Sequence, residues 1–432
     1  MIRTIQISVI IVLTSFFLFP FFFSFLPSIN TKMMMAVLGL ICFALDLLNN
    51  RTQEFRRSLF KISIYALGVS LCSFLSMTIN NTPDNSYLGY IISMWVWLFA
   101  AYFCVSLMKS VHKHISVEII GQYLMAVALI QCTLALLINH YPILQNLTDT
   151  YITGEKYMGV GVEERLYGIG CALDVGGGRL GAILIIMAYL ILLSIKQQKN
   201  KWVFFALVSA SIYILIIGNM IGRTISVGAA IALIYFICSL LFNPEMRSIP
   251  LKPFLFITLI VVLIGGFICI NLYLTDPESQ KLLRFGFEAF FNYFEYGKFE
   301  THSTNMLSEG LIFPDNFKTW LIGDGYMASG SNDPYYTGPS DYGFYMNTDA
   351  GYSRFIFYFG QTGLSVFILF FITVCRECIK KSEDAKYLFI AILLLNLCIW
   401  IKVSTDIFVI FAPFLCLVNS NITNKAEIYN KI

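Results

Sequence analysis

The stretch that decides the fold is Asn347-Thr-Asp-Ala-Gly-Tyr-Ser-Arg-Phe-Ile-Phe-Tyr-Phe-Gly-Gln-Thr-Gly-Leu364, where a long polar segment passes into an apolar one. The polar segment, 275–352, interrupts a chain of 432 residues that is 57% hydrophobic and 13% charged. A soluble globular chain is nearer a quarter charged. We therefore expect 275–352 to lie outside a membrane and the residues after it to re-enter the membrane.

Apolar runs of bilayer-spanning length recur along the chain, and a bilayer core has no water for unpaired backbone groups. The runs are too continuously apolar for the alternating strands of a membrane barrel. The expected fold class is an all-α polytopic membrane protein with a large, partly helical extracytoplasmic loop before the last three helices. Twelve spans are predicted, and the last two are short enough to form one broken unit: 5–26, 33–48, 62–79, 87–108, 115–138, 180–195, 202–217, 225–242, 253–274, 353–375, 387–401 and 403–418. The expected parts are a bundle over 1–274, the loop 275–352, and the last three helices with a short tail over 353–432.

The distribution of Lys and Arg predicts the topology. With the N-terminus in the cytoplasm, most of the 29 Lys and Arg residues fall in cytoplasmic segments. The positive-inside rule then places both termini in the cytoplasm, and the loops 139–178 and 275–352 outside. Few ionisable residues lie within the predicted spans and no internal repeat is visible, which argues against a proton-coupled or repeat-built transporter.

Three outward segments carry distinctive residues. The run Asp174-Val-Gly-Gly-Gly-Arg179 allows close backbone approach, but it lacks the strand–turn–helix context of a nucleotide-binding loop. The tight turn containing Gly222-Arg-Thr224 holds Arg223, which is either an interfacial arginine or a ligand for an anion. Aromatic residues recur at helical spacing over 279–299, so an amphipathic helix is expected there, either packing over the bundle mouth or guiding a lipid-borne substrate.

The polar segment also contains residue types that suit sugars. Tyr, Trp, Asn and Asp are concentrated in it, notably over 333–345. Aromatic faces take the C–H surfaces of sugar rings, and the polar groups take their hydroxyls. External loops are often rich in Tyr and Gly as well, so this composition alone does not identify the ligand.

At this point the chain resembles the Wzy-type O-antigen or capsule repeat-unit polymerases, which share a superfamily with O-antigen ligases. The resemblance rests on the expected topology and on Gly222-Arg-Thr224, Leu321-Ile-Gly-Asp-Gly-Tyr326, Asp349-Ala-Gly-Tyr352 and Tyr358-Phe-Gly-Gln-Thr-Gly363. Arg165 to Gly181 also fits an Arg-x15-Gly pattern of some members, without a second copy. The ligase branch typically has His-Asn where this chain has Asp349-Ala, which favours a polymerase.

The resemblance implies a glycosyltransferase on the outer face of a bacterial inner membrane. It would move a growing glycan from an undecaprenyl diphosphate carrier onto the non-reducing end of another carrier-linked repeat unit. No cofactor, metal or nucleic acid is implied, whereas a flippase and a chain-length regulator are implied partners besides the lipid bilayer. The alternatives are an O-antigen ligase and a flippase or transporter of lipid-linked sugars.

This chemistry requires positive charge on the diphosphate and a group that orients or deprotonates the acceptor hydroxyl. Arg forks suit phosphate oxygens. The predicted catalytic residues are Asp349, Arg223 and Arg354. The predicted diphosphate- or substrate-binding residues are Arg165, Arg179, Asp324, Tyr326, Tyr352 and His302, with Asp324 and His302 as reserve candidates for the base. Other roles stay open: an interfacial anchor for Arg354, a helix N-cap for Asp349 and a turn former for Asp324.

Overall fold

A computed structural model describes residues 2–49, 52–112, 114–153, 165–242, 252–328 and 343–418. The α-helices are α1 Ile2–Leu18, α2 Thr31–Leu48, α3 Gln53–Asn80, α4 Tyr90–Val111, α5 Val117–His140, α6 Pro142–Tyr151, α7 Leu173–Lys196, α8 Lys201–Ile221, α9 Ile225–Phe242, α11 Lys252–Thr275, α12 Pro277–Gly286, α13 Glu288–Tyr296, α14 His302–Gly310, α15 Phe317–Ile322, α16 Gly351–Lys381, α17 Lys386–Lys402 and α18 Phe408–Leu415. Two 3-10 turns are η1 Tyr345–Asn347 and η2 Glu383–Ala385. The strands β1 Phe22–Phe23, β2 Leu26–Asn30 and β3 Ile152–Thr153 form an antiparallel sheet in the order β2-β1-β3.

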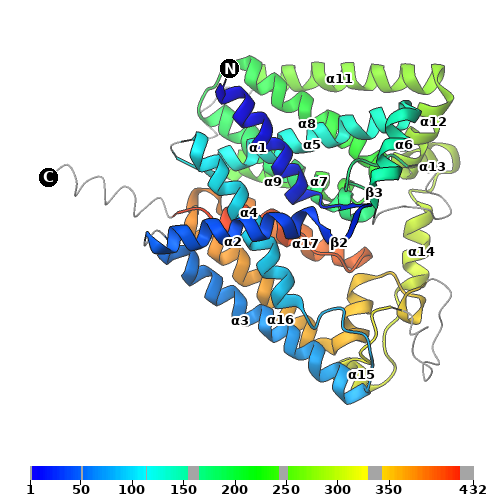
Figure 1. The fold of residues 1–432 in the computed structure, drawn as a ribbon. Coiled ribbons are helices and arrows are strands. Elements are labelled where there is room, and N and C mark those ends of the chain that lie inside the picture. The colour runs from blue at the N-terminus through cyan, green and yellow to red at the C-terminus, as the bar shows by residue number, and fades with distance from the viewer. Residues whose placement is uncertain are drawn as a thin grey trace. The chain divides into compact units, whose positions relative to one another are not determined.

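Ten helices in the described part of the chain are long and apolar enough to cross a membrane (Figure 1). They are α2, α3, α4, α5, α7, α8, α9, α11, α16 and α17 with its preceding turn η2. This supports the expectation of a multi-pass helical membrane protein. The first and last predicted spans fall on shorter helices, since α1 has 17 residues and α18 has 8.

The observed helices differ from several of the predicted ranges. The span 5–26 ends as a helix at Leu18, because Pro20 follows and the β-sheet begins at Phe22. The span 403–418 is α-helical only over α18. The helix predicted from residue 180 already begins at Leu173. The amphipathic helix predicted over 279–299 is two helices, because Phe287 has non-helical torsions (φ −117°, ψ 27°) between α12 and α13.

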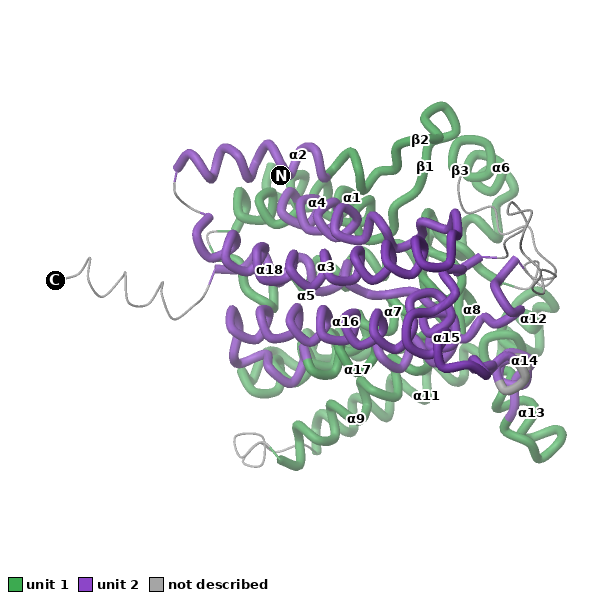
Figure 2. The backbone as a smooth tube through the Cα atoms, turned by 90° about the horizontal axis from the view of Figure 1, so that it is seen from below, with its two compact units in different colours: residues 1–35, 104–299, 390–395 green, residues 36–103, 300–389, 396–432 purple. Residues whose placement is uncertain are grey.

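The chain packs as two compact units (Figure 2). Unit 1 comprises residues 1–35, 104–299 and 390–395, and unit 2 comprises 36–103, 300–389 and 396–432. The expected three-part division at residues 274 and 352 stays a prediction.

The centre of unit 1 is α7, which packs against α5, α8 and α9. Glycines allow α7 and α9 to approach closely: a Cβ on Gly228 would lie 2.3 Å from the Cα of Gly181. A Cβ on Gly177 would lie 2.7 Å from the carbonyl oxygen of Gly222. The glycine-rich run of α7 is therefore a helix-packing surface, which explains its composition without a bound nucleotide.

The centre of unit 2 is α16, which packs against α3, α15 and α18 (Figure 1). An aromatic cluster fills this core: the Phe367 ring centroid lies 4.8 Å from that of Trp400 and 5.0 Å from that of Tyr90. Such aromatic pairs add stability beyond the apolar area they bury.

The helix α16 is irregular at Gly360, whose φ is +68°. A Cβ at Gly360 would lie 2.4 Å from the backbone of Leu321, so α15 ends directly against this break. The N–H of Asp324 donates to the carbonyl of Phe357 (2.5 Å), and that of Gly325 donates to Tyr358 (3.1 Å). These bonds satisfy carbonyls that the irregular helix turn leaves open. The turn after α15 and the start of α16 thus hold each other in place.

Candidate functional site

The predicted site residues divide between the two units. Unit 1 contains Arg165, Arg179 and Arg223. Unit 2 contains His302, Asp324, Tyr326, Asp349, Tyr352 and Arg354. The expectation that Arg223 faces Arg354 stays a prediction.

Arg354 lies in the first turn of α16 and has neutral hydrogen-bond partners. Its guanidinium donates to the hydroxyl of Ser404 (2.7 Å) and to the carbonyl of Met327 (3.0 Å), and its Cζ lies 4.4 Å from the centroid of the Phe344 ring. Its buried Nε has no hydrogen-bond partner, and Arg354 forms no ion pair with any residue that the structure describes. A partly buried cation in this state is a candidate ligand for an anion.

Asp349 is exposed just before α16, and it is not the helix cap. The N-cap is Ala350, which makes no side-chain cap hydrogen bond. The alternative of Asp349 as N-cap was therefore wrong. The carboxylate of Asp349 lies within electrostatic range of Arg354. An exposed carboxylate can take a proton from a substrate hydroxyl.

Asp324 is held inside the turn after α15. One carboxylate oxygen accepts from the hydroxyl of Thr319 (2.6 Å) and the other from the phenol of Tyr345 (3.1 Å). The ring of Tyr345 in turn stacks on Tyr326, with centroids 5.3 Å apart and planes at 16°. The hypothesis of Asp324 as a turn former therefore has direct support. Tyr326 and Tyr345 thus form an aromatic platform that the carboxylate of Asp324 holds in place.

The remaining unit 2 candidates have different surroundings. The hydroxyl of Tyr352 donates to the carbonyl of Leu397 (3.0 Å), and its ring meets Trp400 edge-on. This geometry gives Tyr352 a packing role. His302 is exposed at the start of α14, which Thr301 caps. Most of the segment 333–345, whose residue types suit sugars, lies outside the described residues, which resume at Gly343.

Sequence reasoning missed the short loop between α3 and α4. The carboxylate of Asp84 accepts from the backbone N–H groups of Met327 (2.7 Å) and Ala328 (3.1 Å). The hydroxyl of Tyr87 donates to the carbonyl of Ser404 (3.2 Å). Burial and then the charge of Asp406 raise the pKa of Tyr87 well above its usual value, so it stays a neutral donor. The sequence signal was the polar run Asn80-Asn-Thr-Pro-Asp-Asn-Ser-Tyr87. Asp84 and Tyr87 of this run hydrogen-bond to Met327 and Ser404, the two residues to which Arg354 donates.

In unit 1, Arg223 and Arg165 meet at one aromatic ring. The Cζ atom of each guanidinium lies 4.7 Å from the centroid of Phe285. Arg223 also forms an ion pair with Glu288, at the start of α13. The side chain of Arg223 is 14% exposed, so its ion pair with Glu288 and its cation–π contact with Phe285 are both partly shielded from water. The break between α12 and α13 sets Phe285 and Glu288 beside the turn that carries Arg223.

A hydrogen bond to α7 fixes the turn that carries Arg223. The hydroxyl of Thr224 donates to the carboxylate of Asp174. Burial, and then the charge of Arg165, lower the pKa of Arg223, while Asp174 opposes this shift. Arg223 nevertheless stays protonated at neutral pH, because an arginine pKa starts above about 12. Two cations that repel each other at one ring would be stabilised by a bound anion.

Arg179 lies apart from this pair. It is buried, at 8% exposure, and it donates to the carbonyl of Leu18 (2.8 Å) while its Cζ lies 5.9 Å from the Phe19 ring centroid. These contacts join α7 to the end of α1. They favour a structural role for Arg179 over contact with a substrate.

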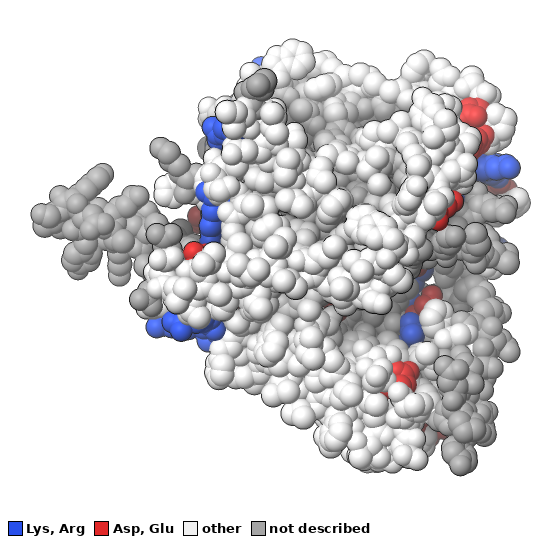
Figure 3. Space-filling model, viewed as in Figure 1, with Lys and Arg blue, Asp and Glu red and all other residues white. Residues whose placement is uncertain are grey.

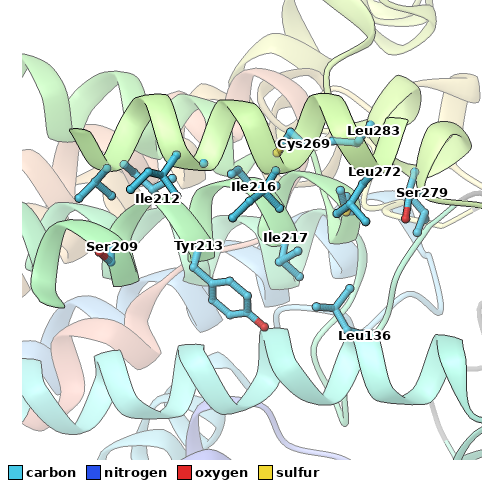
Figure 4. A pocket seen from close by; sticks show the side chains of 16 residues that line it. Leu136, Ser209, Ile212, Tyr213, Ile216, Ile217, Cys269, Leu272, Ser279 and Leu283 are labelled. Carbon is cyan, nitrogen blue, oxygen red and sulfur yellow. The ribbon is translucent and has the colours of Figure 1, made fainter. Parts of the chain in front are cut away.

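An apolar cavity of about 350 Å³ lies in unit 1 among α5, α8, α11 and α12 (Figure 4). Side chains such as Leu136, Ile216 and Leu272 line it. At one end it reaches Leu283, in the same helix as Phe285. The cavity can take a flexible hydrocarbon chain. Because α12 contributes both to the cavity lining and to the ring under Arg165 and Arg223, such a chain would end near these two arginines.

Among the described residues, no three His, Cys, Asp or Glu side chains gather in a way that could hold a metal ion. Comparison with models of known protein families gives no match. Comparison with curated proteins gives no match either.

Proposed function

We propose that the protein is a membrane glycosyltransferase that polymerises oligosaccharide repeat units carried on undecaprenyl diphosphate. In this proposal the chain crosses a bacterial inner membrane twelve times with both termini in the cytoplasm. The reaction takes place on the outer face, where the growing glycan passes to the non-reducing end of a new repeat unit. A flippase would supply the substrate, and a chain-length regulator would act beside the enzyme.

The observation that carries the proposal is the combination of Arg165 and Arg223 on the Phe285 ring with an apolar cavity that reaches the same helix. A ligand that suits both features has a strongly anionic head and a long apolar chain. A polyprenyl diphosphate has these two parts. Arginine is well suited to the head because its planar fork matches phosphate oxygens.

Roles for the unit 2 residues follow from their contacts. Arg354 is a further cation for phosphate oxygens, since its charge has only neutral hydrogen-bond partners. The platform of Tyr326 and Tyr345 suits a sugar ring, and Asp349 is the candidate base. In the reaction, the bond between the anomeric carbon and the diphosphate oxygen breaks, and its electron pair stays on the diphosphate. The acceptor oxygen bonds to the anomeric carbon, and its proton passes to Asp349.

A deletion strain tests the proposal through the ladder of its surface polysaccharide. A polymerase deletion is expected to leave lipid A with a single repeat unit, whereas a ligase deletion leaves none. A flippase deletion is expected to trap the lipid-linked unit on the cytoplasmic face, where an added outer-face glycosidase cannot reach it. An unchanged ladder would contradict the polymerase and the ligase together.

The variant Asp349→Asn tests the assignment of the base. The amide keeps the size of the side chain but cannot take the proton, so the polymerisation rate is expected to fall by roughly 10²-fold or more. Asp324→Asn is the comparison, because its effect should come through the turn and therefore through protein stability. A near-normal chain length with Asp349→Asn would exclude Asp349 as the base.

A further inference from the structure

A charged hollow lies in unit 2, away from every residue assigned above. It has a volume of about 510 Å³ and lies between α3 and α16. Lys61 and Tyr65 line it from α3, and Arg376, Glu377 and Lys380 line it from α16. Lys and Arg side chains gather beside the first turns of α3 on the molecular surface (Figure 3).

One buried carboxylate holds two lysines at this hollow. Glu377, whose side chain is 6% exposed, accepts from Lys61 (3.2 Å), from Lys380 (2.7 Å) and from the hydroxyl of Ser58 (3.0 Å). The two lysine side chains are about half exposed, at 49% and 60%. Glu377 thus fixes both ammonium groups while leaving them open to a second anion.

The hollow keeps a surplus of positive charge. Arg376 is exposed, and within the described chain no hydrogen bond or ion pair engages its guanidinium. Three cations therefore surround a single carboxylate. A network that served only to join α3 to α16 would need Glu377 and the lysines, but it would not need Arg376.

The position of the hollow along α16 indicates its depth in the membrane. After the irregular turn at Phe359 and Gly360, α16 continues over 361–381, which is about 32 Å at 1.5 Å per residue. Arg354 lies before this turn, and Arg376 lies in the last two turns of the helix. The part of α16 after the irregular turn thus matches the thickness of the hydrocarbon core of a bilayer, about 30 Å. In a membrane crossed by this part of α16, the hollow lies at the level of the lipid head groups on the side opposite to Arg354.

We propose that this hollow binds the head group of an anionic phospholipid from the leaflet opposite to Arg354. The phosphate contacts the ammonium groups of Lys61 and Lys380 and the guanidinium of Arg376. The ring of Tyr65 lies against the part of the lipid next to the head group. Basic pockets between transmembrane helices bind anionic lipid head groups by such contacts. The site is independent of the proposed reaction.

The test is binding to the purified full-length protein in a neutral detergent, measured with short-chain lipids. Dioctanoyl-phosphatidylglycerol is expected to bind at least about tenfold more tightly than dioctanoyl-phosphatidylcholine. The double variant Arg376→Gln/Lys380→Gln should weaken phosphatidylglycerol binding by roughly 10- to 30-fold. The control Lys386→Gln removes an exposed cation at the start of α17, outside the hollow, and should leave binding unchanged.

Three outcomes would overturn the proposal. They are equal binding of the two lipids, unchanged binding by the double variant, and displacement of the lipid by inorganic phosphate at similar concentration, which would indicate a site for free phosphate. If the double variant unfolds, the single variant Arg376→Gln decides, because it breaks no hydrogen bond or ion pair among the described residues. It should lower the affinity severalfold at an unchanged Tm.

Discussion

Arg223 in unit 1 and Arg354 in unit 2 both pack on a phenylalanine ring, but they differ in what surrounds their charge. Arg223 forms an ion pair with Glu288 and shares its ring with Arg165. Arg354 donates to a hydroxyl and a carbonyl, and its Nε has no partner among the described residues. An anion that binds at Arg223 must therefore compete with a directly paired carboxylate, whereas at Arg354 the carboxylate of Asp349 acts only at longer range.

This difference predicts unequal roles. A partly buried charge without a salt-bridge partner is costly, and the longer-range attraction of Asp349 offsets this cost only in part, so its retention points to a ligand that supplies more negative charge. An ion-paired arginine has a structural role even without a ligand, because it joins the turn after α8 to α13. We therefore expect Arg354 to act mainly on the bound anion and Arg223 to act both on the anion and on the local structure.

The largest effect is expected from Arg354→Ala. Loss of this cation should lower the polymerisation rate by about 10²- to 10³-fold, the scale of removing one preorganised group that stabilises developing charge. Arg354→Lys should recover little, because one ammonium cannot replace a planar fork held by Ser404 and Met327. Surface-polysaccharide ladders and the rate with purified lipid-linked substrate measure this. Full rescue by lysine at an unchanged protein level would show that charge alone is needed.

A smaller loss is expected from Arg223→Ala, roughly 10- to 10²-fold, because Arg165 remains at the same ring. The matched control is Arg284→Gln. Arg284 also forms an ion pair, with Glu295, and lies over a phenylalanine ring, that of Phe291. Its side chain is more exposed, at 43%, and it has no proposed role in the reaction. An equal loss of rate in both variants would mean that Arg223 acts only through the packing of α12 and α13.

The ion pair at Arg223 gives a sharper prediction. If Glu288 competes with the substrate for this guanidinium, Glu288→Gln should lower the KM for the lipid diphosphate by roughly two- to fivefold, the scale of a partly exposed ion pair. The rate at saturation should change little. A KM that rises would instead show that Glu288 positions Arg223, and the contrast between the two arginines would then be one of geometry and not of competition.

How far the sequence predicts these features depends on whether the signal is local. Hydropathy located the apolar helices, and the turn expected at Leu321–Tyr326 contains Gly323 and Gly325, both with positive φ. The positive φ of Gly360 was not predicted, because this residue falls within the predicted span 353–375. The roles of Phe285 and Glu288 were not predictable, because they depend on a helix break at Phe287 that brings them to a turn some sixty residues earlier. Asp84 was missed because its partners are backbone N–H groups distant in sequence, which leave no pattern in the residue types.

The smallest effect on activity, but a clear one on stability, is expected from Gly228→Ala. The added methyl would lie 2.3 Å from the Cα of Gly181, so α7 and α9 must move apart. We expect a loss of about 1–3 kcal/mol in the free energy of unfolding, measured by thermal unfolding in detergent.

The control for this prediction is Gly266→Ala in α11, where no atom lies within 4 Å of the added Cβ. There the higher helix propensity of alanine should leave stability unchanged or raise it by up to about 1 kcal/mol.

Because α9 begins beside Thr224, separation of α7 from α9 disturbs the turn of Arg223, whereas Arg354 belongs to the other unit. In the Gly228→Ala background, Glu288→Gln should therefore lose its effect on KM while Arg354→Ala keeps its full effect on rate. If both effects persist, the packing of α7 against α9 does not position Arg223.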